Sequence, residues 1–190
     1  MEHREQVAQL LEESPIIAAV KDDQGLEVAL HTECRMVFLL YGNICNVAEL
    51  VAKLKDAGKI VMVHVDLIDG LASKEVSVTF IRRNTRADGI ISTKPVIVKF
   101  AREQGLMTVQ RFFLIDSIAM ENCRKYIETG KADMIEILPA AMPKIIRKIT
   151  DYCKIPVIAG GLITDKEDIM LALQSGAMGV SSTNHSVWNL

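Results

Sequence analysis

Two apolar runs near the C-terminus end in residues that suit the binding of an anion. One run ends in Gly160 and Gly161, and the next ends in Ser181, Ser182, Thr183 and Asn184. If the runs are neighbouring parallel strands, their ends bring backbone N–H groups and hydroxyl groups to one place. A short helix after Asn184 would add its positive end, which stabilises a nearby anion by about 0.3–2 kcal/mol. The pattern predicts a phosphate pocket here.

A histidine and two carboxylates lie at positions that can face the inside of a barrel. His64 and Asp66 share the parity of Met62, and Glu136 shares that of Met134. Because alternate residues of a barrel strand point inward, all three are predicted to do so. The two carboxylates could act as acid and base or bind the hydroxyl groups of a polyol. They could also belong to a structural hydrogen-bonded network, since a buried charge requires partners.

Cationic partners for a phosphate are available on two other runs. Lys94 follows the apolar run 88–93, and Arg111 lies within the run 106–114. Either can supply the positive charge that a phosphate requires. Gln110 and Arg111 are neighbours, so only one of them can face the barrel, and the sequence leaves open which one does.

Two basic clusters are candidate contacts for the phosphates of a nucleic acid. They consist of Arg82, Arg83 and Arg86, and of Lys144, Arg147 and Lys148. Either cluster can equally be a solvated face, because cations are favourable near the C-terminus of any helix. The net charge of −2 provides no whole-protein field that attracts nucleic acid, so such binding would require a local patch.

Eight apolar runs, separated by segments with helical spacing, must position these residues. They predict strands at 15–20, 36–42, 59–68, 88–93, 106–114, 132–138, 155–161 and 177–183. Continuous apolar strands that alternate with helices indicate a parallel sheet covered by helices. Eight such units favour a closed (β/α)8 barrel of the TIM type over an open sheet. In that fold a phosphate is usually bound by the loops after strands seven and eight.

The length and the first segment agree with a minimal barrel. Residues 1–190 are predicted to be one domain with a very short last helix, whereas about 250 residues is typical of the fold. Val7, Leu10 and Leu11 have helical spacing and are followed by Pro15. The helix that carries them is predicted to close the bottom of the barrel.

Composition restricts the class of protein further. No apolar run approaches the ~18 residues of a membrane span, and the charged first residues do not resemble a signal peptide. A cytoplasmic location is therefore expected. The cysteines form no C-x-x-C pair and have no histidine at metal-ligand spacing. Reduced, mostly buried thiols are expected for Cys34, Cys45, Cys123 and Cys153, and no metal or cofactor is expected for the protein.

Two absences argue against catalysis. The run 132–138 has no lysine for Schiff-base chemistry. The segment from His64 to Gly70 resembles the third-strand motif of phosphate-binding decarboxylases but lacks the lysine between its aspartates. No catalytic residue is therefore assigned. The alternative is a phosphate-binding lyase or isomerase that uses Asp66 and Glu136 on a small phosphorylated polyol or triose.

Six stretches together resemble the glycerol uptake operon antiterminator regulatory proteins, the glycerol-3-phosphate responsive antiterminator family. The stretches are H-V-D-L-I-D-G-L (64–71), D-G-I-I-S-T-K (88–94), Q-R-F-F-L-I-D-S (110–117), I-E-I-L-P (135–139), I-P-V-I-A-G-G-L-I (155–163) and V-S-S-T-N-H-S-V-W (180–188). The resemblance covers nearly the whole chain, and its I-I-S-T-K and Q-R-F-F-L-I-D-S stretches are specific.

The resemblance implies a regulator and not an enzyme. It implies that glycerol 3-phosphate is the effector and that the liganded protein binds leader mRNA of glycerol-use genes, prevents transcription termination and stabilises the transcript. Applied to this sequence, it assigns the phosphate to Gly160, Gly161, Ser182 and Thr183, with Lys94 or Arg111 balancing the charge. It assigns the hydroxyl groups to Asp66, Glu136 and His64. Whether the chain forms a homo-oligomer is left open.

Overall fold

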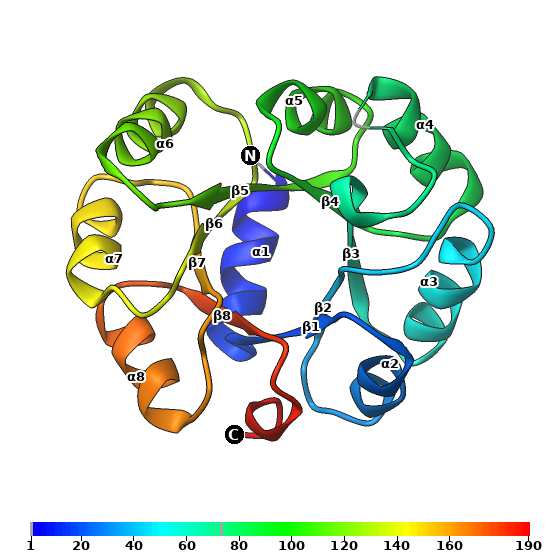
Figure 1. Cartoon of the computed structure of the whole chain (residues 1–190), viewed down its shortest axis with the longest axis horizontal. Coiled ribbons are helices and arrows are strands. Elements are labelled where there is room, and N and C mark those ends of the chain that lie inside the picture. The colour runs from blue at the N-terminus through cyan, green and yellow to red at the C-terminus, as the bar shows by residue number, and fades with distance from the viewer. Residues whose placement is uncertain (1, 73) are drawn as a thin grey trace.

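Eight parallel strands close into a barrel in the computed structural model, which describes residues 2–72 and 74–190. The strands pair in sequence order, and the first strand pairs with the last. Figure 1 shows the barrel with its helices arranged around it. The predicted (β/α)8 barrel is therefore confirmed.

Each strand lies within one of the eight predicted runs. The strands are β1 (Ile16–Val20), β2 (Met36–Leu39), β3 (Ile60–His64), β4 (Gly89–Ser92), β5 (Met107–Phe113), β6 (Met134–Leu138), β7 (Val157–Gly160) and β8 (Gly179–Ser182). The third run was predicted to continue to residue 68. The strand instead ends at His64, and the chain turns into the 3-10 helix η1 (Val65–Leu67). The prediction that Asp66 continues the inward face of this strand is therefore wrong.

Seven α-helices follow the first seven strands. They are α2 (Asp23–Leu30), α3 (Val47–Asp56), α4 (Glu75–Asn84), α5 (Pro95–Glu103), α6 (Ser117–Thr129), α7 (Pro143–Thr150) and α8 (Lys166–Gln174). After β8 there is only the 3-10 helix η2 (His185–Val187), which confirms the very short last helix. No helix in the described part of the chain is long and apolar enough to cross a membrane.

Alternate strand residues fill two separate cores. The inside of the barrel is packed by one cluster, whose strand residues are Ile17, Ala19, Met36, Phe38, Met62, Ile91, Val109, Met134 and Ile158. The space between strands and helices is packed by a larger cluster that includes Ala18, Val37, Val61, Ile90 and Ile135. This alternation is the pattern of a closed barrel. The direction of any strand side chain can therefore be inferred from its neighbours.

The first helix, α1 (Glu2–Glu13), crosses one end of the barrel (Figure 1). Its residues Val7, Leu10 and Leu11 are buried in the inner cluster. The helix therefore closes the end at which the strands begin, as predicted. The loops that follow the strands gather at the other end.

The four cysteines are free thiols. Cys34 and Cys123 are buried, Cys153 is partly buried and Cys45 is exposed. The prediction of unpaired cysteines is confirmed.

Candidate functional site

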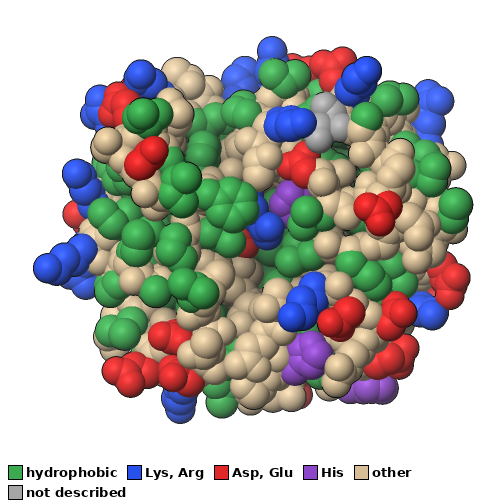
Figure 2. Space-filling model, viewed as in Figure 1, with side chains coloured by type: hydrophobic (Ala, Val, Ile, Leu, Met, Phe, Trp, Pro, Cys, Tyr) green, Lys and Arg blue, Asp and Glu red, His purple; other side chains and the backbone are tan. Residues whose placement is uncertain are grey.

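A hollow of about 300 Å³ opens at the end of the barrel where the strands finish. Figure 2 shows this face, hollowed at its centre, with cationic and histidine side chains below a rim rich in hydrophobic side chains. Strands β5, β6 and β8 supply Arg111, Glu136 and Ser181 to the wall. The loops after β7 and β8, with the end of β8, supply Gly161, Leu162, Ile163, Thr164, Ser182, Thr183 and Asn184.

A buried ion pair lies at the base of this hollow. Arg111 has the same parity as Val109, a member of the inner cluster, and so points into the barrel. Its Nε donates to Glu136 Oε2 at 2.5 Å, and the two side chains are only 7% and 0% exposed. Ser181 Oγ donates to Glu136 Oε1 at 2.6 Å. Gln110 points the other way, where its Nε2 donates to the carbonyl oxygen of Thr93 at 2.9 Å.

Two glycines, the last residue of β7 and the residue after it, shape the hollow for different reasons. A Cβ on Gly160 would lie 2.5 Å from Ser181 Oγ and 2.7 Å from Glu136 Oε1, so a side chain there would displace both groups. Gly161 has a φ of +74°, which glycine adopts without strain. Leu162 follows with a φ of +61° and is 69% exposed at the rim. These residues turn the chain over the mouth of the barrel.

Hydrogen bonds join the two loops of the wall. Ser182 Oγ donates to the carbonyl oxygen of Ile163 at 2.9 Å, and the Asn184 side-chain amide donates to that of Thr164 at 2.9 Å. The indole N–H of the buried Trp188 donates to the carbonyl oxygen of Ser182 at 2.8 Å. The hydroxyl group of Ser182 therefore holds the two loops together, and η2 is fixed to β8 beneath them.

A second cluster of polar side chains lies around the ends of β3 and β4. Asp66 accepts the Thr93 N–H at 2.8 Å and the hydroxyl groups of Ser92 and Thr93 at 3.0 and 3.1 Å. Burial raises the pKa of Asp66, but these hydrogen bonds outweigh it and leave that pKa below its ordinary value. His64 Nδ1 lies 3.9 Å from Asp66 Oδ2. Burial, followed by the charge of Arg111, lowers the pKa of His64 to about 4, so the imidazole is neutral at pH 7.

The predicted ligand residues fall into two sets. Gly161, Ser182, Thr183, Arg111 and Glu136 line the hollow together. The others, His64, Asp66, Gly160 and Lys94, are not among the described residues that line it. Gly160 lies against Glu136 and Ser181, and the electrostatic effect of Arg111 reaches His64. Lys94 is exposed at the start of α5.

The two predicted basic clusters lie on the outside of the barrel, on separate helices. In the first, Arg82 donates to the Gln104 side chain at 2.9 Å, and Arg86 pairs with Asp56 at 2.6 Å just beyond α4. In the second, on α7, Arg147 donates to the carbonyl oxygen of Gln174 at 3.0 Å. Arg82, Arg86 and Arg147 are therefore exposed but already have partners within the chain. The remaining ones, Arg83, Lys144 and Lys148, are also exposed.

Sequence reasoning counted Ser181 among the hydroxyl residues at the end of the last strand, but it did not identify this residue as the hydrogen-bond donor to Glu136. The direction of its side chain follows from the structure of the last strand. A Cβ on Gly179 would meet Leu11 and Ile17, which belong to the inner cluster, so residues of that parity point inward. Ser181 has this parity, whereas Ser182 does not. Ser92 and Thr93, the donors to Asp66, were missed because their partner lies on a turn that was predicted as strand.

The titratable side chains of the described residues give no metal centre. No group of three or more His, Cys, Asp or Glu side chains within 2–72 and 74–190 could hold a metal ion. The chemistry of the hollow is instead that of a buried guanidinium beside a carboxylate, hydroxyl groups and glycine backbone. Such a set suits a small anionic molecule that carries hydroxyl groups.

The chain is similar in sequence to one described family and to a protein of Escherichia coli. Residues 16–188 match the family described as glycerol-3-phosphate responsive antiterminator. The chain is 45% identical over 181 residues to uncharacterized protein YgcP of Escherichia coli (strain K12), with 95% of each chain covered.

Two solved structures superpose on nearly the whole chain. A glycerol uptake operon antiterminator regulatory protein from Listeria monocytogenes strain 4b F2365 gives a TM-score of 0.87 at 32% identity, covering 91% of this chain and 94% of that chain. A glycerol uptake operon antiterminator-related protein from Thermotoga maritima MSB8 gives 0.81 at 35% identity, covering 92% and 98%. These similarities confirm the resemblance predicted from the sequence.

Proposed function

We propose that the chain, which belongs to the glycerol-3-phosphate responsive antiterminator family, binds glycerol 3-phosphate in the hollow at the mouth of the barrel and then binds leader mRNA of glycerol-use genes. The observation that carries the proposal is the Arg111–Glu136 ion pair, buried below a wall of glycine backbone and hydroxyl groups. Effector binding would favour the conformation that binds RNA, by its differential affinity for two states. RNA binding would prevent termination and stabilise the transcript.

The charges in the hollow suit a phosphate monoester. Arg111 uses its Nε on Glu136, and a guanidinium carries five N–H donors in a planar fork that matches phosphate oxygens. Gly161 and Thr183 lie on the two loops where phosphates are bound in barrels of this kind. The volume of about 300 Å³ is at the small end of ligand pockets, which fits a ligand of this size.

The hydroxyl groups of the glycerol moiety require hydrogen-bond acceptors near the phosphate. Glu136 is the carboxylate that lines the hollow beside Arg111. Asp66 and the neutral His64 lie around the neighbouring strand ends. We assign Glu136 to the nearest hydroxyl group, and His64 and Asp66 to the positioning of Arg111 or to the far hydroxyl group.

The ligand is tested by thermal unfolding with and without glycerol 3-phosphate. At about 100 times its dissociation constant, a ligand raises the free energy of unfolding by about 2.7 kcal/mol, or roughly 5–11 °C in Tm for a chain of this size. Gly161→Asp should abolish this rise, because it places a carboxylate against the phosphate. A normal rise in Gly161→Asp would contradict the assignment of the site.

Two matched variants separate charge from backbone strain. Gly161→Asn has nearly the same shape as Gly161→Asp and tolerates the same positive φ, but carries no charge, so it should retain part of the ligand response. Gly58→Asp has a similar φ of +76°, and a Cβ there meets nothing within 4 Å. It should lose stability from strain but keep the full ligand response.

The enzyme alternative requires a carboxyl group that can exchange a proton with a substrate. Glu136 is paired with the buried guanidinium of Arg111, and the pKa of Asp66 lies below its ordinary value. The ion pair of Glu136 and the low pKa of Asp66 favour carboxylates that bind a ligand over carboxyl groups that exchange a proton with it. Turnover of a phosphorylated triose with a bell-shaped pH profile would favour the hypothesis of a lyase or isomerase over that of a regulator.

A further inference from the structure

A cationic groove lies at the other end of the barrel from the hollow. It has a volume of about 710 Å³ and runs between α6 and α7, against α1 and the segment before β7. Four cations line it, with one carboxylate, from Glu128. The cations, which we call the groove cations, are Arg4, Arg124, Lys148 and Lys154. A protein with a net charge of −2 thus concentrates positive charge in one concave place.

The groove cations differ in how they are held. Arg4 Nε and Nη2 donate to the carbonyl oxygen of Ala132 at 3.1 and 2.7 Å, which fixes this charge at the foot of the groove. Arg124 faces Glu121 at 3.4 Å and Glu128 at 3.9 Å, both along α6. Lys148 and Lys154 are exposed and take no part in the ion pairs between described residues.

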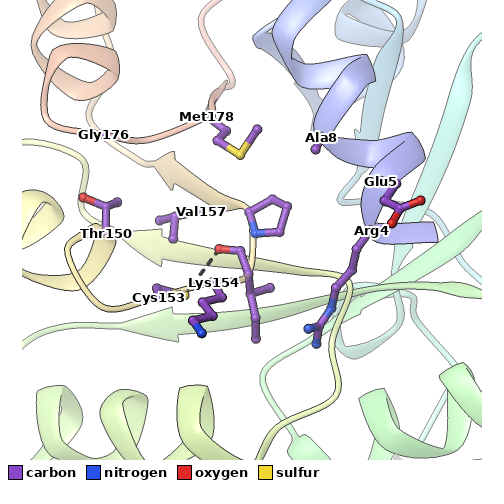
Figure 3. A pocket seen from close by; sticks show the side chains of 11 residues that line it. Arg4, Glu5, Ala8, Thr150, Cys153, Lys154, Val157, Gly176 and Met178 are labelled. Carbon is purple, nitrogen blue, oxygen red and sulfur yellow. Dashed lines mark hydrogen bonds between the residues drawn. The ribbon is translucent and has the colours of Figure 1, made fainter. Parts of the chain in front are cut away.

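The positive surface continues into an adjoining hollow of about 320 Å³, which also includes Arg4 and Lys154. Figure 3 shows Arg4 from α1 and Lys154 from the segment before β7 extending toward the same edge of this hollow. Glu5 is the acidic residue that lines it. The two hollows share Arg4, Lys154 and Ile155 and therefore form one continuous concave surface at the bottom of the barrel.

An aromatic side chain lies among the cations. Tyr152 follows α7, lines the groove and is 38% exposed. Proteins that bind single-stranded nucleic acid combine cations along the backbone path with aromatic rings on which unpaired bases stack. A duplex would present its phosphates without an accessible base face, so the ring favours a single strand.

We infer that the groove between α6 and α7 is the surface that binds single-stranded RNA, with Lys148 and Lys154 contacting phosphates and Tyr152 stacking on a base. The inference rests on the proposed function, because it names the site of the RNA partner. It selects one member of the second predicted basic cluster, Lys148, and adds Tyr152 and Lys154, which the sequence did not single out. It leaves Arg82, Arg83 and Arg86 as a solvated face.

The test measures the affinity for a labelled leader transcript of a glycerol-use operon, with glycerol 3-phosphate present, over a salt series. Each phosphate contact in a single strand contributes about 0.7 to the slope of log affinity against log salt. Lys148→Gln/Lys154→Gln should therefore weaken binding and reduce the slope by about 1.4. Tyr152→Ala should weaken binding about 5- to 150-fold, the effect of one lost stack. Tyr152→Phe keeps the ring and should bind as the unchanged protein does.

The matched control is Arg82→Gln/Arg83→Gln, which removes the same charge from exposed positions on α4. It should leave the affinity and the slope unchanged. The ligand-induced rise in Tm is recorded for every variant, and should be normal in all of them because none lies at the effector hollow.

Three outcomes overturn the inference. An equal loss of RNA affinity in the α4 control and in the groove variants would mean that RNA responds to the total charge of the protein and not to the groove. Unchanged RNA binding by the groove variants would place the RNA surface elsewhere and leave the proposed function intact. Absence of RNA binding by the unchanged protein, with a normal response to glycerol 3-phosphate, would remove the RNA step of the proposed function itself.

Discussion

The charge balance between Arg111 and Glu136 gives the sharpest test of the effector site. Glu136→Gln removes the negative charge, while the amide oxygen can still accept from Arg111. Loss of one partner of a buried ion pair costs about 3–5 kcal/mol, and the retained hydrogen bond favours the lower end. A loss of about 3 kcal/mol corresponds to a fall of roughly 6–12 °C in Tm for a chain of this size.

The anionic ligand should reverse most of this loss. In the variant, the phosphate becomes the counter-charge of a guanidinium that is otherwise unpaired, whereas in the unchanged protein it shares Arg111 with Glu136. We therefore expect Glu136→Gln to bind glycerol 3-phosphate more tightly and to show a larger ligand-induced rise in Tm. Calorimetric titration and thermal unfolding measure the two quantities on the same sample.

Ser181→Ala is the matched control for this experiment. It removes the 2.6 Å hydrogen bond to Glu136 Oε1 but leaves both charges. Loss of one hydrogen bond costs about 1 kcal/mol, and the ligand response should stay close to normal. A ligand-induced rise in Glu136→Gln that equals or falls below the normal value would refute the reasoning, because Arg111 would then not be the partner of the phosphate.

Three further predictions concern the stability of the site. Because the pKa of His64 lies at about 4 and its ordinary value is 6.5, the unfolded chain binds more protons between these values. The free energy of unfolding should fall by about 3 kcal/mol from pH 6.5 to 4, and His64→Gln should flatten this fall in urea titrations. Gly160→Ala should cost about 1–3 kcal/mol in the same assay, because its Cβ overlaps Ser181 and Glu136. Trp188→Phe, which leaves the Ser182 carbonyl without its indole donor, should cost about 1–3 kcal/mol in thermal unfolding.

Alternation along the strands predicted much of the interior correctly. Glu136 was placed inside because it shares the parity of Met134, and both are buried on that side. The rule depends only on the period of a strand, so it needs no knowledge of neighbouring strands. It also chooses between Gln110 and Arg111 once Val109 is known to lie inside.

The same rule failed at Asp66, for a physical reason. The apolar residues Val65, Leu67 and Ile68 continue the pattern of the third strand, although the chain turns there into η1. The pairing of β3 with β2 ends at Val63 and Leu39, and its pairing with β4 ends at His64 and Ile91. The end of a strand is defined by its hydrogen bonds to neighbouring strands, which the local pattern does not contain.

The contacts of the site depended on register, which the sequence did not provide. Ser181 reaches Glu136 because β7 and β8 align Gly160 with Ser181, and β6 and β7 align Glu136 with Ile158. Lys94 was a reasonable phosphate ligand by position, but it is the residue just before α5 and its side chain is exposed. Loop residues have no period from which a direction can be inferred.

The closure of the barrel by α1 has a consequence for the timing of a response. Val7, Leu10 and Leu11 fill the far end, so the hollow has a mouth on the strand-end side and a packed floor. A ligand that enters by this mouth must also leave by it. Closure of the rim around Leu162 then slows the entry and the exit of the ligand by the same factor. The equilibrium affinity stays unchanged unless the closed rim adds contacts with the ligand. The residence time of the proposed effector can thus be adjusted at the rim independently of the concentration at which the protein responds.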